Sequence, residues 1–149
     1  MSRSPLRLVA LLLGTLLTFA AMAQETSSDD ERYVVDIELQ TVTEFRQLLE
    51  RAEQLLLAGV VLQDDVPKVT FVLHGPVVRN LLRQNYLDNK RTVDLAASLT
   101  AMGVIDVKAC LTWMGGNGVE EADLQPFVET VAYGPAEVRR LKQQSYIYF

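Results

Sequence analysis

The sequence contains a single cysteine and a single histidine among its 149 residues. One cysteine excludes an intramolecular disulfide, so Cys110 is either buried and inert, paired with another molecule, or kept for thiol chemistry. One cysteine and one histidine also argue against a zinc site built within one chain. We therefore predict no metal.

Several motifs of catalysis and cofactor binding are also missing. The sequence has no CxxC, HExxH or GxSxG, so thioredoxin-like, zinc-peptidase and α/β-hydrolase functions lack their motifs. Gly115, Gly116 and Gly118 lack the spacing and the lysine of a P-loop, and they form no dinucleotide fingerprint. We interpret these glycines as a flexible turn around Cys110, and we predict no cofactor.

Positive charge is scarce. The formal net charge is −5, and no basic stripe interrupts the acidic composition. An acidic chain of this kind is a poor partner for nucleic acid or for an anionic membrane surface. Beyond the N-terminal region the sequence has no second long apolar segment, so we expect no membrane association of the processed chain.

The N-terminal region has the three parts of a secretory signal. Arg3 and Arg7 precede an apolar run from Leu8 to Met22, and small residues lead to a cleavage site after Ala23. The apolar run is short for a membrane span, which needs about 20 residues. An uncleaved N-terminal anchor is the alternative. Residues 1–23 are therefore predicted as a signal peptide, which places the protein in the periplasm or outside the cell.

The remaining chain is predicted to form one domain. Residues 24–32 are polar and acidic, as expected for a flexible linker. Residues 33–149 are enough for one hydrophobic core and too few for two.

Strand and helix patterns alternate along this domain. A capping box of Thr41 and Glu44 begins one helix, which stops at Gly59. Proline follows glycine at two further helix starts, Gly75-Pro76 and Gly134-Pro135. The predicted strands are 33–39, 68–74, 104–109 with Cys110 directly after it, 127–132 and 145–149; further helical segments are predicted at 92–102 and 120–124. This alternation favours an α/β fold with a mostly parallel sheet covered by helices on both faces.

Two candidate residues fall at the carboxyl ends of strands. Cys110 and His74 both occupy such positions, where parallel α/β sheets bind their ligands. Lys108 lies two residues before Cys110, on the same face of a regular strand, where its ammonium could support a thiolate or point to solvent. His74 is a candidate general base, or else its ring merely holds the strand-to-helix turn.

Trp113 and Met114 lie between the cysteine and the glycines. They could line a pocket or an oligomer contact, or they could cover the edge of the core.

Three segments, in this order, resemble the DsrE/DsrF-like proteins of the branch with signal peptides. The resemblance covers about residues 33–149. The segments that carry it are 72–76; 103–110 with Gly118-Val119; and 123–128 with Gly134-Pro135, Leu141 and the aromatic tail 146–148.

This resemblance implies a three-layer α/β/α fold with a five-stranded, mainly parallel sheet. It also implies a homo-oligomer, a trimer or a hexamer. The best-understood members are cytoplasmic and carry sulfur as a persulfide on a cysteine that Cys110 matches, so Cys110 would be the sulfur-accepting nucleophile. The predicted export and the Trp113-Met114 pair with its following glycines depart from that pattern.

We therefore expect an exported sulfur carrier that acts through Cys110 and exchanges sulfur with a donor or acceptor protein. The alternative is a non-catalytic periplasmic binding or assembly module with a structural cysteine, and a third hypothesis is a redox sensor. A carrier should expose the thiol beside polar groups. A binding module could bury Cys110 under Trp113.

Overall fold

The computed structural model describes residues 31–36, 38, 40–60, 62 and 66–149. The predicted signal peptide and residues 24–30 of the predicted linker lie outside these residues, as do Ile37 and Leu39 of the first predicted strand. In the described part of the chain, the predicted alternation of strands and helices is confirmed.

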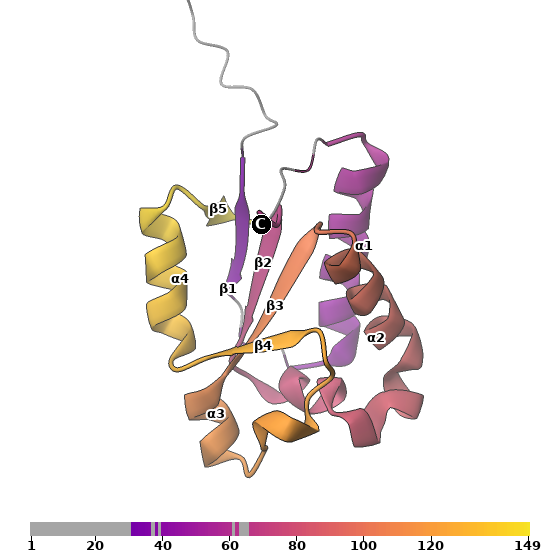
Figure 1. Ribbon diagram of the computed structural model, residues 1–149, viewed down its shortest axis with the longest axis vertical. Coiled ribbons are helices and arrows are strands. Elements are labelled where there is room, and N and C mark those ends of the chain that lie inside the picture. The colour runs from indigo at the N-terminus through magenta and orange to yellow at the C-terminus, as the bar shows by residue number, and fades with distance from the viewer. Residues whose placement is uncertain (1–30, 37, 39, 61, 63–65) are drawn as a thin grey trace, which may run out of the picture.

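A five-stranded sheet forms the middle of the domain, and neighbouring strands in it are all parallel (Figure 1). Its strand order is β4-β3-β2-β1-β5. The strands are β1 (Tyr33–Asp36), β2 (Val69–Leu73), β3 (Ile105–Cys110), β4 (Val128–Val131) and β5 (Ile147–Tyr148). All five residues of β2 are buried, as expected for a central strand covered on both faces.

Helices cover both faces of the sheet and produce the predicted three layers. The long helices α1 (Val42–Leu57) and α2 (Tyr86–Ala101) lie on one face, and α4 (Gly134–Gln143) packs on β1 and β2 at the other (Figure 1). The short helix α3 (Leu111–Gly116) follows β3 directly. Three 3-10 helices, η2 (Pro76–Leu81), η3 (Arg83–Asn85) and η4 (Glu121–Asp123), complete the connections.

Each face of the sheet has its own apolar core. The larger core lies under α1, α2 and η2, where Phe71 of β2 meets the ring of Phe45 edge-on, with ring centroids 5.5 Å apart. The smaller core lies under α4 and contains Val34, Val72, Val138, Leu141 and Tyr146. Side chains alternate between faces along a strand, so the residues two positions beyond Val34 and Val72 also face α4.

The local signals that begin and end α1 act as predicted. The Thr41 hydroxyl accepts the backbone N–H of Glu44 at 3.2 Å, and the Glu44 carboxylate accepts the backbone N–H of Thr41 at 2.9 Å. These bonds satisfy two backbone donors that a helix start leaves free. Gly59, just after the helix, has a φ of +80°, a conformation that glycine adopts without steric cost.

Three local predictions differ from the structure. The helix at Gly75-Pro76 is the 3-10 helix η2, and the next helix begins at Tyr86 rather than at Thr92. Leu87 in the first turn of α2 is exposed to solvent, so this turn lacks the apolar spacing of the later turns of the helix. Met102, expected on the buried face of that helix with Leu95 and Leu99, is 45% exposed just beyond its end.

The predicted flexible turn at Gly115 and Gly116 was wrong. Both glycines belong to α3, whose Met114 is buried and whose last turn is closed by a hydrogen bond from Asn117 to the Met114 carbonyl. Burial of that methionine fixes the backbone as a helical turn despite the glycines. Of these three glycines, Gly118 alone has a positive φ, +65°, where the chain leaves the helix.

Within the described ranges, no helix is both long enough and apolar enough to span a bilayer.

Candidate functional site

The candidate site lies where β1, β2 and β3 end, on the sheet face that α4 covers. Cys110 is the last residue of β3, and His74 directly follows β2. β2 and β3 are neighbours, with Val72 paired to Lys108 and Leu73 to Ala109. The parallel register therefore brings Cys110 and His74 side by side at the carboxyl edge. Strand direction predicted the edge, but whether the two residues approach each other depends on strand order and stayed open in the sequence.

The Cys110 thiol is covered by the protein. The residue is 2% exposed, and its Sγ accepts the backbone N–H of Gly134 at 3.2 Å. Gly134 is the first residue of α4, so the positive end of this helix meets the sulfur. A backbone N–H at a helix N-terminus favours negative charge on a neighbouring sulfur, whereas burial away from water disfavours it.

Gly134 lies unusually close to both candidate residues. A Cβ added at this glycine would lie 3.4 Å from the Cβ of His74 and 3.5 Å from the Cβ of Cys110. It would also lie 3.3 Å from Cγ1 of Val72. The missing side chain allows the start of α4 to press against the ends of β2 and β3, which is how its N–H reaches Sγ.

The His74 ring is paired with a residue that the sequence analysis did not identify. Its Nε2 lies 3.3 Å from Oδ1 of Asp36, the last residue of β1. The two side chains are 22% and 29% exposed, so the pair is half-buried at the same edge. No hydrogen bond between His74 and Cys110 is found among the described residues.

Lys108 does not reach the thiol. Its ammonium lies 2.9 Å from an Asp106 carboxylate oxygen and 2.8 Å from a Glu129 carboxylate oxygen. Burial lowers the pKa of Lys108, but the hydrogen bonds and charges of Glu129 and Asp106 outweigh burial, and the pKa lies above its ordinary value. The ammonium is therefore held as part of an ion-pair cluster and does not serve as a free cation beside Cys110.

Trp113 does not cover Cys110. It packs, partly buried, against the larger core on the α1 and α2 side, and the guanidinium of Arg79 lies 5.8 Å from its ring centroid. Arg79 also donates to the carbonyl of Asn117 at 3.1 Å. The interpretation of Trp113 and Met114 as cover for the core edge therefore fits their positions. Gly115, Gly116 and Gly118 are exposed, and a Cβ added at any of them would have no neighbouring atom within 4 Å.

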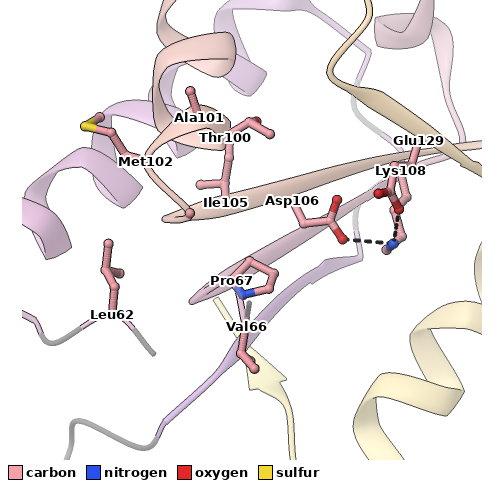
Figure 2. A pocket seen from close by; sticks show the side chains of 11 residues that line it. Leu62, Val66, Pro67, Thr100, Ala101, Met102, Ile105, Asp106, Lys108 and Glu129 are labelled. Atoms are coloured by element: carbon pink, nitrogen blue, oxygen red, sulfur yellow. Dashed lines mark hydrogen bonds and ion pairs between the residues drawn. The ribbon is translucent and has the colours of Figure 1, made fainter. Parts of the chain in front are cut away.

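A surface pocket of about 580 Å³ lies at the other end of the sheet (Figure 2). It runs from the end of α2 to the start of β3 and includes the ion-pair cluster of Asp106, Lys108 and Glu129. It does not include Cys110 or His74. The charges of this cluster partly cancel, because the Lys108 ammonium pairs with the carboxylates of Asp106 and Glu129, as the dashed lines in Figure 2 show.

In the part of the chain that the structure describes, no three histidine, cysteine, aspartate or glutamate side chains group closely enough to hold a metal ion.

Comparison with known proteins identifies the fold but not a family. No model of a known protein family matches the sequence, and no curated protein matches it. The fold is similar to that of a protein of unknown function, MTH1491 from Methanobacterium thermoautotrophicum, with a TM-score of 0.63 and 21% sequence identity. The alignment covers 80% of this chain and 98% of that one. An identity this low supports the α/β architecture alone.

Two residues of the site, Asp36 and Gly134, were missed as site residues in the sequence. Asp36 had only a weak signal, because it is a polar residue in an apolar run, and the predicted strand 33–39 placed it before the strand end that the structure shows. Gly134 had none beyond its place at a helix start, since its contact with Sγ joins positions 24 residues apart.

Proposed function

We propose that this protein handles sulfur compounds through the thiol of Cys110, as a carrier that accepts one sulfur atom and passes it on. The observation that carries the proposal is the hydrogen bond from the Gly134 N–H, at the N-terminus of α4, to Sγ. The donated N–H points at the atom that would carry the charge of a thiolate, which is the nucleophilic form of cysteine. The resemblance to DsrE/DsrF-like proteins, in which a matching cysteine carries a persulfide, supports the same function.

The loading step requires a persulfide or polysulfide donor. The Cys110 thiolate attacks the terminal sulfur of a donor R–S–SH, and a bond forms between Sγ and that sulfur. The bond between the terminal sulfur and the inner sulfur of the donor breaks. Its electron pair leaves on R–S⁻, the terminal sulfur keeps its proton, and Cys110 becomes a persulfide. No external oxidant or reductant is consumed.

The burial of Cys110 sets a condition on this step. A donor reaches Sγ only if it is small or if the segment that covers the sulfur moves. That segment is tied to α3, because Thr112 donates to the Ala132 carbonyl through its backbone N–H at 3.3 Å and through its hydroxyl at 2.7 Å. Thr112→Val removes the hydroxyl bond at nearly constant volume, so we expect it to accelerate modification of Cys110.

Intact-mass spectrometry tests the proposal directly. The purified protein is incubated with inorganic polysulfide, and Cys110→Ser serves as the control. Gain of one sulfur atom, absent from the serine variant and reversed by a reductant, is the expected result. A folded protein that gains no sulfur, and whose thiol reacts only after denaturation, would show that the proposal is wrong.

The burial of Cys110 favours a second candidate function. A thiol that is 2% exposed is also what a small, inert core residue requires. Under this second hypothesis the protein is a binding or assembly module, and Leu111 and Tyr133, which are exposed beside the covered sulfur, belong to its contact surface. Replacing Cys110 with serine would then leave partner binding intact.

Export and self-association are further parts of the proposal. Residues 1–23 support export to the periplasm or beyond, which N-terminal sequencing of the protein recovered from cell fractions can test. The family resemblance supports a trimer or hexamer, which light scattering coupled to gel filtration can test.

A further inference from the structure

Three neighbouring strands place one reactive or ionisable side chain each at the same edge. Asp36 ends β1, His74 follows β2 and Cys110 ends β3, and the sheet order makes these strands adjacent. Asp36 lies two residues after Val34, and His74 two residues after Val72, so both point to the face that α4 covers. Gly134 of α4 contacts the cysteine and the histidine from that face.

We propose that Asp36 is a positioning residue whose carboxylate orients the His74 ring, so that His74 accepts the proton of the Cys110 thiol. This inference rests on the proposed function, because it matters only if Cys110 reacts. The Sγ–H bond breaks, the electron pair stays on Sγ where the Gly134 N–H already donates, and the proton moves to the histidine.

The contact with Asp36 also determines which ring nitrogen can accept that proton. In neutral His74, Nε2 carries the hydrogen that faces the Asp36 carboxylate, at a separation of 3.3 Å. Nδ1 is then the nitrogen with a free lone pair. Proton transfer from Sγ to Nδ1 requires a closer approach or one bridging water, since catalytic hydrogen bonds are often long before the substrate binds.

Two other charged groups on this face, Lys108 and Glu137, have partners of their own. Lys108 is held by Asp106 and Glu129. Glu137 of α4 is held by Arg140, whose hydrogen bond lowers the pKa of that carboxyl below its ordinary value. The ion pairs of Lys108 and Glu137 are with other groups, whereas Asp36 is paired with His74.

The test measures how fast iodoacetamide modifies Cys110 in the folded protein between pH 5 and pH 9. Asp36→Asn keeps the shape of the side chain but removes its charge, so the rate profile should move to higher pH. At pH 7 we expect the rate to fall by about threefold to tenfold. Asp106→Asn is the matched control, because this carboxylate lies on the same face without contacting His74, and it should leave the profile unchanged.

A second comparison separates positioning from a merely structural role. His74→Gln should shift the profile in the same direction, and the double variant with Asp36→Asn should be no slower than His74→Gln alone, because both changes interrupt one interaction. Urea unfolding of each variant checks that the fold is kept. An Asp36→Asn protein whose Cys110 reacts with iodoacetamide at the wild-type rate across this pH range, or is slowed equally at every pH, would overturn the role of Asp36 while leaving the proposed function in place. Failure of the wild-type protein to accept sulfur would instead overturn the proposed function, and the inference with it.

Discussion

Replacing Gly134 with alanine tests whether the start of α4 is packed against the sulfur as closely as the structure indicates. The added methyl would lie 3.3 Å from Cγ1 of Val72, 3.4 Å from Cβ of His74 and 3.5 Å from Cβ of Cys110. Carbon atoms prefer separations of about 3.5–4.0 Å. All three neighbours belong to the ends of β2 and β3 or to the smaller core, so none is the free end of a flexible side chain.

The expected cost follows from two opposing effects. Overpacking of this kind typically destabilises a protein by about 1–3 kcal/mol. Alanine regains at most about 1 kcal/mol through its higher helix propensity, and less at the first residue of a helix. We therefore expect Gly134→Ala to lower the free energy of unfolding by about 1–2 kcal/mol, and Tm by about 4 °C or more.

Urea unfolding and thiol labelling together measure this effect. Gly116→Ala is the matched control, because a Cβ there meets nothing within 4 Å and the variant should be neutral or slightly more stable. Only the contact with Cγ1 of Val72 is tighter than ordinary van der Waals contact, so Val72 or the start of α4 must give by a few tenths of an ångström. We expect the start of α4 to shift, which would change the labelling rate of Cys110 in the folded state. If Gly134→Ala were as stable as the wild type and its thiol reacted at the wild-type rate, the close packing of α4 on Cys110 would be refuted.

Three further predictions concern the core, the helix cap and the ion-pair cluster. Phe71→Ala should lower the free energy of unfolding by about 3–5 kcal/mol in urea, because its fully buried ring packs against Phe45; a cost below about 1 kcal/mol would contradict that packing. Thr41→Ala should cost about 1 kcal/mol at neutral pH. The bond from the Glu44 N–H to the Thr41 hydroxyl does not depend on pH, so part of the difference should persist in acid. The Thr41 hydroxyl also lowers the pKa of Glu44, so a further part is present above the ordinary pKa of 4.5 and is lost as the pH falls through the folded-state value; a difference that does not change with pH would contradict this part. The pKa of Lys108 is raised in the folded state, so its contribution to stability is complete below the ordinary value of 10.5 and is lost as the pH rises through the folded-state pKa. The free energy of unfolding of Lys108→Met should therefore differ from that of the wild type at pH 8 and approach it at strongly alkaline pH.

The element pattern of the fold was largely predictable from local signals. The capping box at Thr41, the continuous apolar run of β2 and the Gly134-Pro135 helix start each act within a few residues, so the sequence shows them directly. Where the signal was weak, the prediction failed. The first turn of α2 points Leu87 to solvent, so it lacks an apolar pattern. The glycines of α3 predicted a flexible turn, but burial of Met114 holds this segment as a helix.

The candidate site was predictable only in outline. Strand direction alone placed His74 and Cys110 at one edge of the sheet, because all parallel strands end there. Burial of Cys110 was not predictable, since the residue that covers it is 24 positions away and acts through its backbone. The contact between His74 and Asp36 spans 38 positions and depends on β1 lying next to β2, which the strand order settles and the local pattern does not.

Gly134 both donates a hydrogen bond to the candidate nucleophile and covers it, and this coupling limits how the thiol can react. Gly134 donates its N–H to Sγ and also presses the start of α4 over it. A large reagent must displace this segment, so it meets a sulfur that has lost its hydrogen-bond donor. A small donor that enters without displacing α4 meets a sulfur that still has it. A carrier built in this way would therefore discriminate among donors by size, because only small sulfur donors would react with a sulfur that keeps its hydrogen bond to Gly134.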